Sequence, residues 1–254
     1  MTPTGPLSSN LKALPVLRRQ VCNPVRPKPA RVVSNRSFGE QAMPGSEAEL
    51  LNQGLESLAL DLSAQQRSDL LAYLELLRRW NKRFNLTAVK DARDMVTRHL
   101  LDSLATLPYL GKGPVIDVGT GAGLPGLPLA VAAPEVSFTL LDSHGKRTKF
   151  LTHVKASLGI ANIAIVNSRV EDFIPEQPFS QIWSRAFSSL DAMMTSSAHL
   201  LRADGEFVAL KGKHPDSELS EINGYLNEVH IASVQVPGLL EDRCVVRFSV
   251  SHPV

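Results

Sequence analysis

The residues best suited to chemistry form a glycine-rich turn, DVGTGAGLPG, at 117–126. The apolar run before the turn predicts a strand over 115–119, and the residues after it predict a helix over 123–133. Glycines at the carboxyl end of a strand let the backbone turn sharply and pass close to a ligand. Such a turn is a weak signal alone, because a purely structural turn has the same composition. Its position between a strand and a helix favours a ligand site.

A carboxylate strengthens this interpretation. The next predicted strand, 136–142, ends at Asp142, roughly 20 residues after Gly119, where an acidic side chain can accept hydrogen bonds from both hydroxyls of a ribose. The alternative is a tight turn followed by a helix-capping aspartate. The strand–turn–helix order favours a cofactor that contains a nucleoside.

The elements around these residues predict an α/β fold. Strands are expected over 115–119, 136–142, 163–170, 181–187 and 206–212, and helices over 123–133, 145–158, 190–202 and 215–228. Alternating strands and helices are typical of a parallel, doubly wound sheet. The last two strands, 231–237 and 244–250, are separated by too few residues for a helical crossover, so they should form an antiparallel hairpin. We therefore predict a Rossmann-like, mostly parallel seven-stranded sheet with a C-terminal antiparallel hairpin.

That hairpin separates two cofactor classes. Both NAD and S-adenosylmethionine would place a ribose at Asp142, but a dinucleotide-binding fold continues to a sixth parallel strand. A terminal hairpin is instead typical of S-adenosylmethionine-dependent methyltransferases. Pro125 and Pro128 are also unusual at the start of a helix that must present amides to a pyrophosphate, which S-adenosylmethionine lacks. We predict S-adenosylmethionine, with an NAD-linked oxidoreductase as the rival interpretation.

The chain divides into three parts. Residues 1–42 are rich in proline and carry seven Lys or Arg against one Glu, which predicts a disordered extension upstream of a natural start at Met43, or an organellar transit peptide. Residues 43–112 should form an N-terminal helical cap, with helices over 47–60, 64–83 and 92–107. A capping box at Ser63 and Gln66 marks the start of the second helix. Residues 113–254 should form the S-adenosylmethionine-binding methyltransferase domain.

Composition narrows the partners. The net charge of +2 combines +6 in residues 1–42 with −4 in the rest, so any affinity for nucleic acid must come from local basic patches. No apolar run approaches the ~20 residues that span a bilayer. Two cysteines form no disulfide framework, and no Cys/His cluster has zinc spacing. We expect a cytoplasmic monomer without a metal.

Several linked strings carry a family resemblance. They are WN and NLT within 80–87, RHLLDS at 98–103, DVGTGAGLPG at 117–126, LLDS at 140–143 followed by KR and FL within 146–151, SRVE at 168–171, SRAF at 184–187 and ALKG at 209–212. In this order they resemble the bacterial 16S rRNA guanine-N7 methyltransferases, the RsmG or glucose-inhibited division protein B family. The resemblance covers roughly residues 47–250, a far more specific match than one glycine-rich turn.

The resemblance implies methyl transfer to N7 of guanine 527, in the 530 loop of 16S rRNA in the small ribosomal subunit. It places Gly119 and Leu124 at the methionine side of the cofactor and Val170 and Glu171 at the adenine, with Arg185 closing the pocket. Other methyltransferase substrates (another RNA, a protein or a small molecule) stay open on the fold alone, as does a non-catalytic RNA-binding or assembly factor.

The proposed chemistry needs no catalytic base, because guanine N7 already carries a lone pair. An enzyme acting on an exocyclic amine usually carries an Asn/Asp-Pro-Pro-aromatic loop, where this chain has SRAF at 184–187. A cytosine-C5 enzyme needs a cysteine, and we expect neither Cys22 nor Cys244 near the strand tips. His99 is expected to be a structural hydrogen-bonding residue rather than a base.

RNA contacts are expected from basic residues near the strand tips and the cap, which neutralise phosphates. The candidates are Arg98, Lys146, Arg147 and Lys211, within the wider clusters Arg78, Arg79, Lys82 and Arg83; Lys146, Arg147 and Lys149; and Lys211 and Lys213. Arg98 could contact phosphate or pair with Asp102 at i, i+4. Trp80, Phe84 or Phe187 could stack on a base, although helical spacing from Leu77 favours a core position for Trp80.

Overall fold

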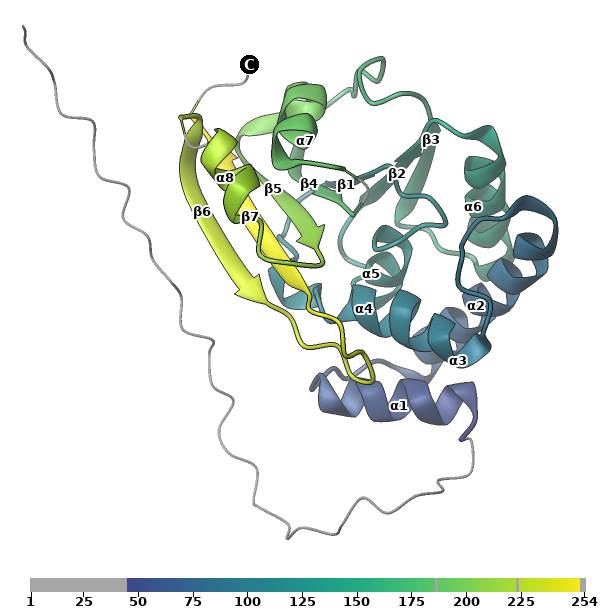
Figure 1. The fold of residues 1–254 in the computed structure, drawn as a ribbon. Helices are drawn as coiled ribbons and strands as arrows, with labels where there is room; N and C mark the ends of the chain where they lie inside the picture. The colour runs from purple at the N-terminus through teal and green to yellow at the C-terminus, as the bar shows by residue number, and fades with distance from the viewer. Residues whose placement is uncertain (1–44, 186, 223, 252–254) are drawn as a thin grey trace, which may run out of the picture.

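One seven-stranded sheet organises the molecule (Figure 1). The computed structural model describes residues 45–185, 187–222 and 224–251, so the predicted extension at 1–42 lies outside the described residues. The strands are β1 Val115–Val118, β2 Phe138–Asp142, β3 Ile163–Asn167, β4 Phe179–Ser184, β5 Leu201–Lys211, β6 Leu226–Ser233 and β7 Cys244–Val250. Their order is β3-β2-β1-β4-β5-β7-β6, with β7 antiparallel to both β5 and β6. The predicted fold class, including the antiparallel hairpin, is confirmed.

Helices cover both faces of the sheet. One face carries α5 (Gly126–Ala132), α6 (Gly145–Leu158) and the N-terminal helices, and the other carries α7 (Leu190–Ser197) and α8 (Asp216–Ile222). A short 3-10 turn, η3 (Ala198–Leu200), leads into β5. Successive strand side chains alternate between these two faces, so Ile116 joins the α7 side while Val115 joins the α5 side.

The cap consists of α1 (Glu47–Ser57), α2 (Ala64–Phe84) and a continuous helical run made of α3 (Ala92–Met95), a π-helical segment η1 (Val96–Leu101) and α4 (Asp102–Leu104). A 3-10 turn, η2 (Leu107–Tyr109), leads towards β1. The predicted capping box at Ser63 and Gln66 is present. Leu70, Leu74 and Leu77 of α2 are fully buried, in the same apolar cluster as α5 and α6. The cap therefore buries its apolar face against α5 and α6, which cover one face of the sheet.

Several predicted boundaries were wrong. Helix α5 begins at Gly126 rather than at residue 123, because glycines with positive φ keep the chain in a turn until then. The predicted helix over 215–228 ends at Ile222, and β6 begins at Leu226, where it pairs with β7. Strand β5 starts at Leu201 instead of residue 206. In these last two cases, pairing with a strand distant in sequence overrides the local helical pattern.

No helix within the described residues is long and apolar enough to cross a membrane. The same part of the chain contains no group of three or more His, Cys, Asp or Glu side chains that could hold a metal ion.

Candidate cofactor site

The glycine-rich turn follows β1 and is tied to the tip of β2. Gly119, Gly121 and Gly123 have φ values of +69°, +63° and +98°, which favour glycine because a Cβ atom crowds the backbone there. The Gly121 N–H donates to Asp142 Oδ2 at 2.9 Å. At Gly126, an added Cβ would lie 2.8 Å from Asp117 Oδ2. Glycine at position 126 therefore lets the turn approach Asp117 closely, and the positive φ of Gly121 accompanies its hydrogen bond to Asp142.

Asp117, in β1, is a buried carboxylate with one unpartnered oxygen. Its Oδ2 accepts from the Thr120 hydroxyl at 2.7 Å and from the Gly126 N–H at 2.9 Å. Its Oδ1 is buried and has no hydrogen-bond partner among the described residues. Burial raises the pKa of Asp117 to about 6, while the hydrogen bonds from Thr120 and Gly126 oppose that rise. The turn thus covers a carboxylate of which only one oxygen, Oδ2, receives hydrogen bonds.

Asp142, at the end of β2, is only 2% exposed and is well supplied with donors. Its Oδ1 accepts from the His144 N–H at 2.8 Å, and Arg147 lies 3.1 Å from Oδ2. The two backbone donors, from Gly121 and His144, fix the carboxylate at the strand tip. The Arg147 side chain is 39% exposed, so its contact with Asp142 is open to solvent.

Arg185, directly after β4, is held by the cap. One of its Nη atoms donates to Asp102 Oδ2 at 2.9 Å, and Arg243 Nε donates to Asp102 Oδ1 at the same distance. Asp102 is only 5% exposed. A single buried carboxylate therefore joins the cap, the exit of β4 and the connection between β6 and β7. We call Asp102, Arg185 and Arg243 the arginine clamp.

The arginine clamp excludes one of the two interpretations that the sequence left open for Arg98. Arg98 does not pair with Asp102, whose two oxygens are occupied by Arg185 and Arg243. It pairs instead with Glu241 at 2.6 Å, on the connection between β6 and β7. Its role as a phosphate contact stays a prediction.

His99 lies in the π-helical segment next to the clamp and is 5% exposed. Its Nε2 is 3.0 Å from the Thr87 hydroxyl, whereas its Nδ1 has no partner among the described residues. Burial lowers the pKa of His99 to about 4, so the ring is neutral at pH 7. The expected structural hydrogen bond is confirmed.

Tyr73 is the residue that the sequence interpretation missed. It is fully buried in α2, and its hydroxyl donates to the Ala122 carbonyl of the glycine-rich turn at 2.9 Å. A tyrosine within the apolar stripe of a helix was the available signal, since a buried hydroxyl needs a partner. Asp102 was visible in the RHLLDS string, but its partners lie far away in sequence.

The remaining predicted residues lie in different surroundings. Leu124 is buried in the turn, and Val170 and Glu171 follow the carboxyl end of β3, with Val170 buried and Glu171 exposed. Lys146 is exposed in the first turn of α6. Lys211 is 14% exposed and binds Glu218 at 2.8 Å, which leaves it poorly placed to meet a phosphate.

The predicted position of Cys244 was wrong. Cys244 is the β-ladder partner of Lys211, the last residue of β5. The antiparallel pairing of β7 with β5 therefore brings Cys244 beside the carboxyl end of β5. Cys244 is nevertheless 6% exposed, and burial raises the pKa of its thiol. A buried, protonated thiol is a poor nucleophile. Cys22 lies outside the described residues.

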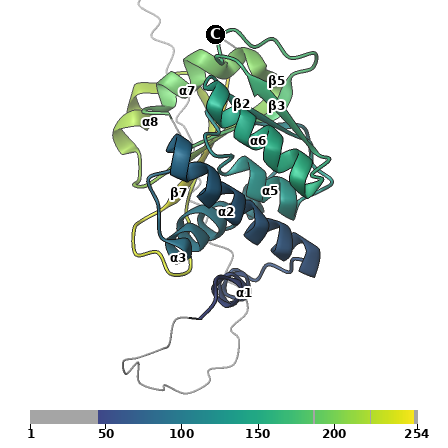
Figure 2. The same cartoon turned by 90° about the vertical axis from the view of Figure 1, so that its right-hand side faces the viewer.

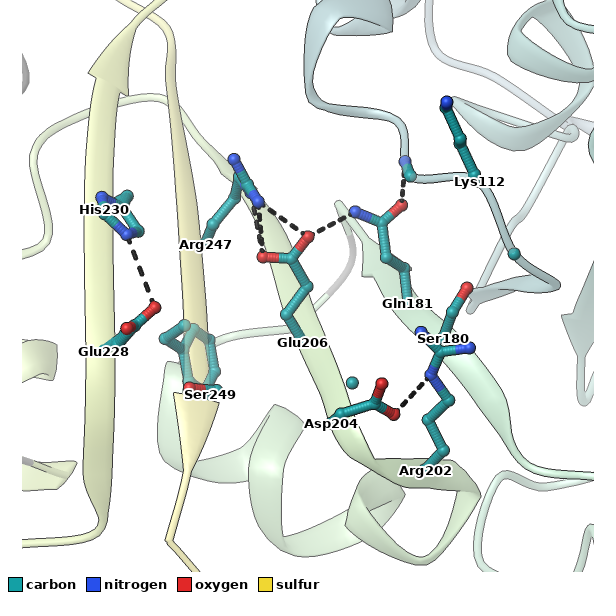
Figure 3. A pocket seen from close by; sticks show the side chains of 14 residues that line it. Lys112, Ser180, Gln181, Arg202, Asp204, Glu206, Glu228, His230, Arg247 and Ser249 are labelled. Atoms are coloured by element: carbon teal, nitrogen blue, oxygen red, sulfur yellow. Dashed lines mark hydrogen bonds and ion pairs between the residues drawn. The ribbon is translucent and has the colours of Figure 1, made fainter.

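A polar cavity of about 360 Å³ lies at the opposite end of the strands (Figure 3). Glu206 lies at its centre and binds both Gln181 and Arg247, at 2.6 Å and 2.8 Å. The Gln181 side chain also accepts from the Gly111 N–H. The members of this network satisfy one another, and none of the described residues that line the cavity has a buried unpartnered atom such as Asp117 Oδ1.

Comparison with known proteins decides the family. The family model described as rRNA small subunit methyltransferase G matches residues 66–246. The chain belongs to this family. The predicted family, the methyltransferase class and the S-adenosylmethionine cofactor are confirmed, and the oxidoreductase interpretation is dropped.

Two members of the rRNA small subunit methyltransferase G family illustrate the similarity. The protein of that name from Ectopseudomonas mendocina is 50% identical over 195 residues, covering 75% of this chain and 90% of the relative. Its counterpart from Marinobacter nauticus is 48% identical over 188 residues, covering 74% and 88%. A crystal structure of the N-methyltransferase NodS from Bradyrhizobium japonicum, in complex with S-adenosyl-L-homocysteine, is 15% identical with a TM-score of 0.46, covering 71% of this chain and 98% of that one.

Proposed function

We propose that this methyltransferase transfers a methyl group to N7 of a guanine in 16S rRNA, the guanine at position 527 in the 530 loop. The substrate is the RNA within the small ribosomal subunit, the enzyme acts as a monomer, and the reaction takes place in the cytoplasm. Membership of the rRNA small subunit methyltransferase G family is the observation that carries this proposal.

The residues at the carboxyl ends of β1 and β2 suit S-adenosylmethionine. Asp142 supplies carboxylate oxygens for the ribose hydroxyls, once Arg147 moves aside. The unpartnered Oδ1 of Asp117 provides the negative charge that a cationic cofactor requires. Gly119 and Leu124 would line the methionine side, and Val170 and Glu171 the adenine side. When bound, S-adenosylmethionine supplies an electrophilic methyl group on a positively charged sulfur.

Arg185 would close the cofactor pocket from the β4 side. The arginine clamp supports this role, because Asp102 fixes the guanidinium in one orientation with a hydrogen bond of 2.9 Å. A charged hydrogen bond between largely buried groups restricts the side chain far more than an exposed ion pair would. The chain would therefore act by positioning its two substrates, which is the main source of catalysis for a reaction without proton transfer.

Attack by guanine N7 agrees with the chemistry of the nearby residues. His99 is buried and neutral, with its Nε2 engaged by Thr87, so it is not available as a base. Cys244 is a buried thiol whose Sγ donates to the Lys213 carbonyl. Neither group is prepared to activate an amine or to attack a pyrimidine ring. A nucleophile that needs no activation suits such a site.

Mapping of the transferred methyl group tests the proposal. The full-length protein is incubated with labelled S-adenosylmethionine and small ribosomal subunits that lack the modification, and the methylated nucleotides are mapped. We expect one labelled nucleotide, a 7-methylguanosine in the 530 loop. Label that appears only at another nucleotide, or at another atom of guanine, would contradict the assignment.

A further inference from the structure

Two basic runs that are separate in the sequence meet on one surface. Helices α2 and α6 pack side by side (Figure 2). The Trp80 ring of α2 contacts two rings of α6 and one ring of its own helix. Its centroid is 5.3 Å from that of Phe84, 5.6 Å from that of Phe150 and 5.5 Å from that of His153. This packing confirms the expected core position of Trp80, which is partly buried. It also brings the last turn of α2 next to the first half of α6.

The cations on this surface are unpaired. Lys82 and Arg83 of α2 and Lys146 and Lys149 of α6 are exposed, and none of them makes an ion pair with a described residue. No acidic residue occurs over 76–90 or 145–158. We call these four residues, together with Phe84, the α2–α6 surface. Its positive charge is not compensated locally, although the net charge of residues 43–254 is negative.

The neighbouring cations of the same two runs are different. Arg78 pairs with Glu47 at 2.6 Å and also with Glu75. Arg79 pairs with Glu75, and Arg147 with Asp142. These three arginines thus have acidic partners, although Arg79 meets Glu75 only in an exposed i,i+4 pair, whereas the other four cations have none among the described residues.

Phe84 gives this surface an aromatic ring. It is the last residue of α2 and is 38% exposed, with the ring resting on Trp80. Exposing an aromatic ring to water is unfavourable unless a ligand covers it. An exposed ring flanked by unpaired cations is the combination that single-stranded nucleic acid recognises, because bases stack on the ring while phosphates meet the cations.

The α2–α6 surface is continuous with the cofactor site through both of its helices. Arg147, between Lys146 and Lys149 in the sequence, contacts Asp142. Tyr73, further along α2 towards its start, holds the glycine-rich turn through Ala122. A single RNA strand bound on this surface would therefore lie beside the elements that hold the cofactor.

We propose that the α2–α6 surface binds the rRNA beside its target nucleotide, with Phe84 stacked on an unpaired base and the four cations on phosphates. This inference rests on the proposed function, since it assumes an RNA substrate. It assigns RNA binding to Lys82, Arg83, Lys146 and Lys149 rather than to Arg147 and Lys211, whose charges are used within the protein.

Three matched double variants test the surface. The pairs Lys82→Gln with Arg83→Gln and Lys146→Gln with Lys149→Gln each remove two charges from it. The control, Lys112→Gln with Arg202→Gln, removes two exposed charges beside the cavity at the amino ends of the strands. Binding of the full-length protein to small ribosomal subunits is measured over a series of KCl concentrations. Each surface pair should weaken binding about tenfold at low salt and lower the log–log salt slope by about 1.5, and the control pair should change neither.

The ring is tested separately with Phe84→Leu, which keeps an apolar side chain but removes the stacking face. Binding should weaken at least about fivefold, with an unchanged salt slope. Affinity for S-adenosylmethionine and the thermal midpoint should stay at wild-type values in all four variants.

The outcomes separate this inference from the proposed function. If the wild type methylates 16S rRNA but the two surface pairs bind subunits as the control pair does, the α2–α6 surface is not the RNA site. If all three pairs weaken binding equally, the attraction is diffuse and the inference is also wrong. If the wild type methylates no small-subunit RNA, the proposed function itself fails.

Discussion

The two ends of the same parallel strands make an instructive contrast. At the amino ends, an open cavity of about 360 Å³ contains a polar network whose members satisfy one another, with Glu206 shared between Gln181 and Arg247. At the carboxyl ends, the chain packs tightly, three glycines adopt positive φ, and Asp117 keeps an unpartnered buried oxygen. The cavity is the more conspicuous feature. The group that destabilises the fold, the half-satisfied carboxylate of Asp117, lies instead at the carboxyl ends.

In this protein the volume of a cavity is therefore a poor guide to the position of the functional site. A satisfied network such as that of Glu206 needs no ligand to be stable. A buried carboxylate that is ionised while one of its oxygens has no donor, as in Asp117, destabilises the fold, and such groups cluster at functional sites.

The largest effect should come from Asp117→Asn. The folded pKa of Asp117, about 6, lies above that of an unfolded aspartate, so the carboxyl stabilises the fold most at low pH and this contribution is lost as pH rises through 6. Asparagine resembles the protonated form. The variant should therefore be more stable than the wild type by about 3 kcal/mol at pH 8, with the gap closing towards pH 4. Urea unfolding from pH 4 to pH 8 measures this.

The same variant should bind S-adenosylmethionine more weakly at pH 8, because the negative charge is gone. A stability gap that does not change with pH, or an unchanged cofactor affinity, would contradict the role given to Asp117.

The next largest effect is expected from Asp142→Ala. Losing hydrogen bonds from a charged acceptor to the ribose should weaken S-adenosylmethionine binding by about thirtyfold. Glu206→Ala, at the amino ends, is the matched control and should leave that affinity unchanged. Isothermal titration calorimetry distinguishes the two. Equal losses in both variants would show that the effect of Asp142 is general destabilisation and not loss of a ribose contact.

A smaller effect should follow Asp102→Asn, which weakens the arginine clamp while conserving shape. We expect kcat/KM for methyl transfer to fall about tenfold, since Arg185 loses a charged hydrogen bond that holds it in place. The control Glu241→Gln removes the exposed ion pair with Arg98, which lies in the same helical run as Asp102. This variant should change kcat/KM little. If the two variants behave alike, the clamp does not position Arg185.

The smallest effect is expected from Tyr73→Phe. The variant loses only the hydroxyl that donates to Ala122, so stability should fall by about 1 kcal/mol. Cofactor affinity should fall severalfold as the glycine-rich turn loosens. Tyr225→Phe, at an exposed position, should change neither quantity. A loss of stability without any change in cofactor affinity would limit Tyr73 to a structural role.

Local patterns in the sequence were sufficient to predict the sheet, the hairpin and the position of the glycine-rich turn. The glycine-rich turn and Asp142 were predicted because a strand, a turn and a helix follow one another directly. Partners distant in sequence could not be predicted in the same way. The sequence allowed Asp102 to pair with Arg98, four residues away, but Asp102 binds Arg185 and Arg243 across the fold.

Partners distant in sequence also decide which basic residues are paired with an acidic residue. The sequence shows basic runs, but pairing with Glu47, Glu75 and Asp142 decides which cations stay free. Cys244 likewise reaches the carboxyl end of β5 only through the hairpin.

The central claim is that the cofactor binds at the carboxyl ends of the strands, and a crystal structure with S-adenosyl-L-homocysteine tests it most directly. We predict density beside residues 119–124, with the ribose hydroxyls on Asp142 and Arg147 displaced from that carboxylate. Density in the cavity around Glu206, with the Asp142–Arg147 contact unchanged, would contradict the account.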